Sequence, residues 1–144
     1  LGSVPHAGET VGPESVWAAI RSLHADRIGH GVRSVEDPVL LDYLAEHAVT
    51  LEVSMTSNVL LGVASSIEEH QLPRLLAAGI PVTLNTDDPA YFGTDLSREL
   101  ELARRVHGLG LDQLAALQRT AIDASFAPAE VKRDVRDELA AFTS

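Results

Sequence analysis

Short apolar segments recur along the chain, and each gives way to polar residues at its C-terminal end. The most apolar, residues 80–84, is hydrophobic on both faces, which is typical of a buried strand in a parallel sheet. Shorter segments of this kind occur within residues 1–9, 27–31 and 50–53. Pro5 cannot donate a ladder hydrogen bond, so the first strand is expected to be truncated or to lie at an edge. The pattern predicts parallel strands whose polar ends lie on one side.

Apolar residues at helical spacing separate these strands. Pro13 and the pair Asp37-Pro38 are start signals of two helices, and Gly79 is the stop signal of a third over residues 69–78. Further helices are predicted over residues 95–106, 112–124 and 128–142. The apolar positions that define the helices are Val16, Trp17, Ile20, Leu23, Leu40, Leu41, Leu44, Ala45, Leu72, Leu75, Leu76, Val131, Val135, Leu139 and Phe142.

A strand–helix order with polar residues at each strand's C-terminal end describes a (β/α)₈ barrel or a doubly wound sheet. No glycine-rich dinucleotide turn follows any strand, which disfavours a nucleotide-binding open sheet. The predicted units in 144 residues amount to half a barrel. We therefore expect an α/β fold, the half of a TIM barrel containing strands five to eight, with extra C-terminal helices, as a single domain over residues 1–144.

Composition narrows the function classes. A hydrophobic fraction of 45% supports a sizeable core, and a formal charge of −10 argues against a nucleic-acid surface. No apolar run reaches the about 18 residues of a membrane span, and no export signal is visible, so a cytoplasmic location is expected. Without cysteine, a metal would be held by histidine and carboxylate, which suits zinc. The chain starts at Leu1 and its single methionine is Met55, so we expect it to be the interior of a longer polypeptide.

The segment Asn85-Thr86-Asp87-Asp88 follows the most apolar strand directly. Two adjacent carboxylates at the mouth of a buried strand repel each other, and burial raises their pKa values. A cation or a substrate donor beside them would offset that cost. The alternative is a turn whose aspartates cap the next helix.

Two histidines also lie at strand ends. His6 is followed by Gly8, which would let the turn bring Glu9 back over the barrel mouth, so His6 fits a metal ligand and Glu9 a general acid or base. The alternative for Glu9 is a helix start, where a carboxylate suits the dipole. His30 stands between glycines, which lack the side chains that would pack around a structural histidine. The helical histidines His24, His47, His70 and His107 are interpreted as solvated or capping.

The segments HAGE (residues 6–9), RIGHG (27–31), TSN (56–58) and LNTDDP (84–89), in this order, resemble the adenosine deaminase family. The helical tail around residues 124–126 is also similar. The resemblance covers essentially the whole chain and is closest in look to bacterial members, some of which act on aminodeoxyfutalosine instead of adenosine. It implies hydrolytic deamination of a 6-aminopurine nucleoside with zinc as cofactor.

The resemblance also implies roles for individual residues. His6 and Asp87 would ligate zinc, and Glu9 would protonate the purine at N1. His30 would orient or deprotonate the attacking water, and Asp87 would also contact that water as a catalytic residue. Asp88 would form a hydrogen bond with purine N7, and Gly8 would belong to the substrate-binding turn. The family's first strand carries an HxH pair that supplies two more ligands, and this sequence has no HxH. The N-terminal half of the barrel is thus an expected partner for catalysis.

Other interpretations stay open at this point. A non-catalytic half-barrel could serve as an interaction or scaffold piece, and another metal-dependent barrel hydrolase could act on a cyclic amide or amine. The expected unpaired edge strands and an open apolar interior face would also favour association with a second chain, including a homo-oligomer.

Overall fold

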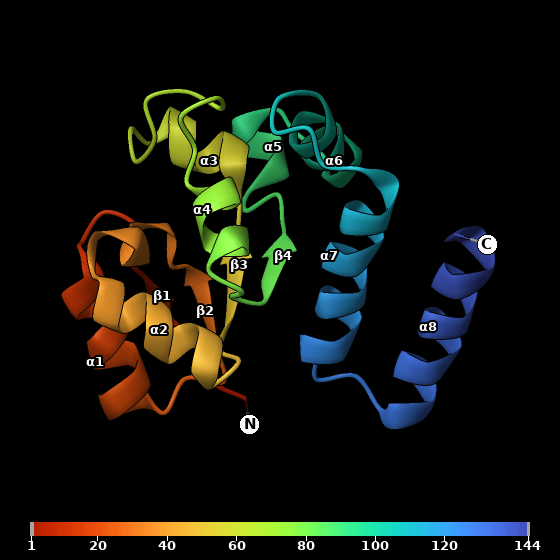
Figure 1. Ribbon diagram of the computed structural model, residues 1–144, viewed down its shortest axis with the longest axis horizontal. Helices are drawn as coiled ribbons and strands as arrows, with labels where there is room; N and C mark the ends of the chain where they lie inside the picture. The colour runs from red at the N-terminus through yellow and green to blue at the C-terminus, as the bar shows by residue number, and fades with distance from the viewer. Residues whose placement is uncertain (1, 144) are drawn as a thin grey trace.

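A computed structural model describes residues 2–143 of the chain. Its centre is a parallel four-stranded sheet in the order β1-β2-β3-β4 (Figure 1). The strands are β1 (His6–Ala7), β2 (Arg27–His30), β3 (Thr50–Val53) and β4 (Val82–Leu84). The sequential order of parallel strands confirms the predicted α/β architecture of a half-barrel. Within the described residues, β1 and β4 are the edges of the sheet.

The helices follow the strands much as predicted. They are α1 (Pro13–Leu23), the 3₁₀ segment η1 (Val32–Glu36), α2 (Pro38–Glu46), α3 (Met55–Leu60), α4 (Leu72–Ala77), α5 (Pro89–Phe92), α6 (Leu96–Arg105), α7 (Leu111–Ala124) and α8 (Ala129–Thr143). Helix α4 begins at Leu72 and not at Glu69, because the ring of His70 accepts the backbone N–H of Leu72. The polar exit after β3 folds into α3, whose Met55 is completely buried.

Strand register separates the sheet into two faces. The apolar face carries Ile28, Leu51 and Val82, which are paired in register and buried against the helices. Buried helix residues that contribute to this core are Val16, Ala19, Leu40, Leu44, Leu72 and Leu75. Asp37 fixes the start of α2 as predicted, since its Oδ1 accepts the N–H groups of Val39 and Leu40.

The opposite face of the sheet is polar. His6, Gly29, Glu52 and Thr83 are paired in register on it, and Arg27 reaches Glu52 with an Nε–Oε1 distance of 2.6 Å. In a closed barrel this face would line the interior. The expectation of an open apolar interior is therefore wrong, because the period of two in each strand sends the apolar residues to the helix side.

The C-terminal helices extend the fold beyond the sheet (Figure 1). Helix α7 packs beside β4, and α8 packs against α7 as the outermost element. The predicted stripe on α8 is only partly covered, with Val131 45% and Phe142 89% exposed. In residues 2–143, no helix is both long and apolar enough to cross a membrane.

Candidate active site

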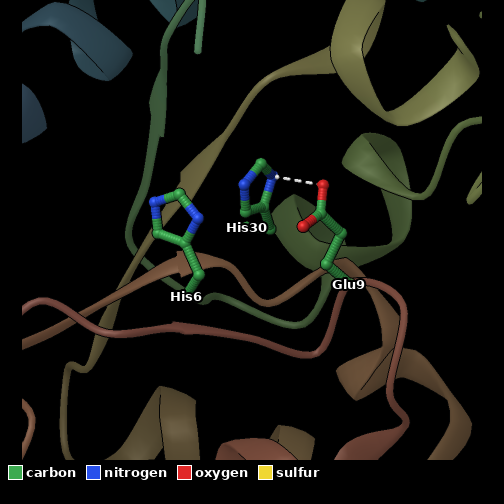
Figure 2. Close-up of side chains that lie close together, drawn as sticks. All are labelled: His6, Glu9 and His30. Atoms are coloured by element: carbon green, nitrogen blue, oxygen red, sulfur yellow. Dashed lines mark ion pairs between the residues drawn. The ribbon is translucent and has the colours of Figure 1, made fainter. Parts of the chain in front are cut away.

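The ends of β1 and β2 bring two histidine rings together. His6 and His30 lie with ring centroids 4.8 Å apart and their planes at 84° (Figure 2). Gly29 makes this approach possible, because a Cβ atom there would lie 2.5 Å from Cδ2 of His6. His6 is exposed at the mouth of the sheet, whereas His30 is 3% exposed. Gly29 therefore leaves room for the imidazole of His6 next to His30. It also places no packing side chain beside His30, as the sequence suggested.

Glu9 reaches the histidines through the turn after β1. Gly8 adopts a φ of +61°, and a Cβ atom on it would lie 2.5 Å from Cγ2 of Val16. The turn is anchored by a hydrogen bond of 2.8 Å from the N–H of Gly8 to Oγ of Ser15. Oε1 of Glu9 then lies 3.4 Å from Nδ1 of His30, as the dashed line in Figure 2 marks. This oxygen is buried and, among the described residues, has no hydrogen-bond partner.

Asp87 approaches the same place from β4. Its Oδ2 accepts a hydrogen bond of 2.7 Å from Oγ of Ser57 and lies 3.9 Å from Nε2 of His30. Both residues have left-handed backbones, with φ of +65° for His30 and +56° for Asp87. Such conformations are uncommon outside glycine and cluster at functional sites. They turn both side chains out of the regular strand direction at the sheet's C-terminal edge.

The neighbouring Asp88 has a different environment. Its Oδ1 accepts the backbone N–H of Tyr91 at 3.2 Å, so Asp88 is the N-cap of α5. The two carboxylates therefore separate: Asp87 faces His30, and Asp88 fills the capping position that was the alternative for this pair.

A cavity of about 440 Å³ opens over these strand ends. Its walls include His6, His30, Glu52, Asn85, Asp87 and Leu96. This volume falls in the range of small-molecule sites. The predicted convergence of His6, His30 and Asp87 on one mouth is thus present in the structure.

Burial sets the electrostatics of the histidines. Burial lowers the pKa of His30 below its usual value, although the Glu9 carboxylate beside it acts in the opposite direction. Of the two alternatives for His70, solvated or capping, the structure supports capping, since the ring accepts the N–H of Leu72 at the start of α4. His70 is not solvated: it is 4% exposed, and burial lowers its pKa to about 4. The sequence pattern gave no signal for this burial, because His70 lies in a polar stretch before α4.

The donors present suit a borderline cation. Nitrogen or oxygen atoms of His6, Glu9 and His30 lie within 4.8 Å of one another, and Asp87 adds a carboxylate next to His30. Imidazole and carboxylate are the ligands zinc accepts where thiolate is absent. The buried Oε1 of Glu9 has no hydrogen-bond partner among the described residues, so it is available to a bound ion or ligand.

Buried polar residues beside the cluster were also missed from sequence. Glu99 of α6 is completely buried and accepts hydrogen bonds from the hydroxyls of Thr56 and Thr94. It joins the segments that follow β3 and β4. No helical or strand period marks a buried glutamate in advance, because its environment comes from packing between separate segments.

Comparisons with known proteins agree with this geometry. A sequence profile of the adenosine deaminase family matches residues 1–142. An aminodeoxyfutalosine deaminase of Streptomyces coelicolor is 46% identical over 144 residues, which is 100% of this chain and 37% of that protein. An adenosine deaminase of Klebsiella pneumoniae is 47% identical over 121 residues, 84% of this chain and 36% of that protein. The chain thus spans well under half the length of these curated relatives.

Solved structures give the same result. The crystal structure of an adenine deaminase from Arthrobacter aurescens matches with a TM-score of 0.96 and 34% identity, covering 99% of this chain and 44% of that one. An amidohydrolase from Burkholderia ambifaria with bound Zn matches with a TM-score of 0.88 and 26% identity, covering 97% and 40%. With a profile match over nearly its whole length and relatives above 45% identity, the chain belongs to the adenosine deaminase family.

Proposed function

We propose that the whole protein carrying this chain hydrolytically deaminates a 6-aminopurine nucleoside or a related compound and releases ammonia. The observation that carries the proposal is the convergence of His6, Glu9, His30 and Asp87 at the strand ends, where His6, His30 and Asp87 line one cavity and Glu9 lies beside His30. Hydrolysis at an aromatic C–N bond needs an activated water, an acid for the ring and a proton acceptor. Imidazole, two carboxylates and a polar cavity provide groups for these tasks.

Each side chain has a task that suits its position. His6 and Asp87 would hold zinc, which supplies a bound water with a pKa lowered towards about 7. Glu9 would give its proton to purine N1, and its unpartnered buried oxygen supports this, because a ring nitrogen would satisfy it. His30 would orient the water, and Asp87, held by Ser57, would accept its proton.

Substrate binding would use the neighbouring turns. Asp88 would hydrogen-bond purine N7 through the carboxyl oxygen that does not cap α5; because N7 carries a lone pair and no hydrogen, this oxygen would be the donor. Gly8 would let the backbone of the β1 turn approach the substrate, since no side chain fits at that position.

Part of the site would come from chain outside residues 1–144. A catalytic zinc usually has about three protein ligands plus water, and this chain offers His6 and Asp87 for that role. The relatives are more than twice as long as the matched region. The N-terminal half of the barrel is therefore the proposed partner. A cytoplasmic location and a homo-oligomer stay predictions.

The test is ammonia release by the whole protein. Adenosine, aminodeoxyfutalosine and adenine are supplied separately, before and after removal of metal with a chelator and after zinc is restored. We expect release from at least one of them, loss with the chelator and recovery with zinc. A correctly folded, zinc-loaded protein that releases ammonia from none would overturn the proposal and favour the non-catalytic alternative.

A further inference from the structure

A buried chain of hydrogen bonds connects the backbone of α4 to His30. The N–H of Leu72 donates to Nδ1 of His70 at 3.0 Å, and Nε2 of His70 lies 3.1 Å from Oδ1 of Asn58. Nδ2 of Asn58 in turn lies 3.2 Å from Nδ1 of His30. Asn58 is completely buried, and its backbone carbonyl accepts the N–H groups of Val63 and Ala64. From sequence, Asn58 belonged only to the TSN segment of the family resemblance, and His70 was interpreted as solvated or capping.

The backbone N–H of Leu72 fixes the direction of every bond in this chain. An amide N–H can only donate, so Nδ1 of His70 must accept, and the single proton of a neutral ring must lie on Nε2. Nε2 then donates, which requires the oxygen of Asn58 to face it. The amide NH₂ of Asn58 therefore faces His30, and Nδ1 of His30 must accept.

We propose that Asn58 and His70 are positioning residues that hold His30 in the tautomer protonated at Nε2. His30 then presents an N–H donor towards the cavity, where Nε2 lies 3.9 Å from Oδ2 of Asp87. In this tautomer neither ring nitrogen has a free lone pair, so His30 can orient a water but can neither ligate a metal nor accept a proton. The ligand and proton-acceptor tasks thereby fall to His6 and Asp87.

Glu9 does not compete with Asn58 for His30. The 3.4 Å between Oε1 of Glu9 and Nδ1 of His30 is longer than an ordinary N–H···O hydrogen bond, and this oxygen has no hydrogen-bond partner in the described chain. Asn58 is the nearer hydrogen-bonding group at Nδ1 and is held by backbone at its own carbonyl. The tautomer follows from this geometry alone, whereas its catalytic consequence rests on the proposed function.

The test is histidine ¹⁵N NMR of the whole protein without substrate, with the His30 signals identified by their loss in His30→Gln. We expect the wild type to show His30 protonated at Nε2 and unprotonated at Nδ1. In Asn58→Asp the carboxylate can only accept, so the proton pattern should invert to Nδ1–H. A wild-type His30 protonated at Nδ1 would overturn the proposal, and this spectrum decides it even if the variant does not fold.

Turnover and KM of Asn58→Asp distinguish a loss of His30 positioning from a loss of folded protein. For Asn58→Asp we expect turnover to fall about 10–100-fold, which is the size of effect seen when a group that orients a metal-ligating histidine is removed, with KM little changed. An inverted tautomer with full turnover would contradict the catalytic part of the proposal. If the wild type shows the expected tautomer but deaminates nothing, the proposed function fails while the tautomer assignment stands.

Discussion

Asp87 and Asp88 are adjacent in the sequence, but their carboxylates lie in different surroundings. Asp87 has a left-handed backbone and faces His30, whereas Asp88 caps α5. Both alternatives suggested by the sequence are thus present, one for each residue. The distinction could not be read from the sequence, because it depends on the φ of Asp87.

Asp88→Ser should weaken substrate binding without unfolding the protein. Serine is as good an N-cap as aspartate, so the free energy of unfolding should change by less than about 0.5 kcal/mol. Its shorter side chain cannot cap α5 and also reach N7, and the loss of a hydrogen bond of about 1–3 kcal/mol should raise KM roughly 5–100-fold with turnover little changed. Asp95→Ser, which alters the cap of α6, is the matched control and should leave KM unchanged. An unchanged KM in Asp88→Ser would remove Asp88 from the substrate site.

Glu9→Gln should reduce turnover by roughly 10²–10⁴-fold, because it removes the acid and leaves the proposed metal ligands in place. Zinc content, measured by elemental analysis, should equal that of the wild type. Glu14→Gln, on the exposed side of α1, is the control and should be fully active. Near-normal turnover of Glu9→Gln would refute the role of Glu9.

His70 should make folding stability depend on pH. Its pKa is about 4 in the folded protein against an ordinary value of 6.5, so between these values the unfolded chain binds a proton that the folded chain excludes. The free energy of unfolding should therefore decrease as pH falls from 6.5 to 4, by up to about 3 kcal/mol. Denaturant unfolding at several pH values measures this slope, which should be smaller in His70→Gln. An equal slope in both proteins would contradict the buried, neutral state of His70.

At the scale of elements, the turn after β1 depends on glycine for two separable reasons. Gly8→Ala meets both a left-handed φ and a contact with Val16, whereas Gly62→Ala meets only the φ of +73° with open space around it. We expect Gly62→Ala to cost about 1–2 kcal/mol of unfolding free energy and Gly8→Ala about 1–3 kcal/mol more. Thermal and denaturant unfolding compare the two. Equal costs would show that Val16 does not restrict the turn.

Regular elements could be predicted from sequence because local signals define them. The structure agrees with three of these signals. The apolar run before Asn85 forms β4, Asp37-Pro38 begins α2, and Gly79 follows the end of α4 with a left-handed φ. The start of α4 was missed because it depends on His70, and the short helix α3 was missed because its polar sequence gives no helical period and its first residue, Met55, is buried in the core. The cluster of His6, Glu9 and His30 was predictable because strand ends in parallel βα units share one edge. The Asn58–His70 chain was not, since two of its three contacts join residues that are 12 and 28 positions apart in the sequence.

For the molecule as a whole, the polar face and the unpaired edges of the sheet point to an incomplete barrel. His6, Arg27 and Glu52 lie on the face that would be the barrel interior, and β1 and β4 have free edges within the described chain. Residues 1–144 alone should therefore bind zinc weakly and associate with another chain. Size-exclusion chromatography with light scattering and zinc titration measure both, and a monomer with tight zinc binding would contradict this expectation.

The claim that these strand ends form part of a deaminase centre is tested most directly by zinc-dependent ammonia release. Three samples are compared: residues 1–144 alone, the same chain with an N-terminal half-barrel carrying an HxH strand, and the whole protein. We predict none from the isolated chain, and release from the complemented chain and the whole protein. Clear activity of the isolated chain would show that the ligand set is wrong. Folded, zinc-loaded whole protein that releases no ammonia from any 6-aminopurine would contradict the claim that these strand ends form a deaminase centre.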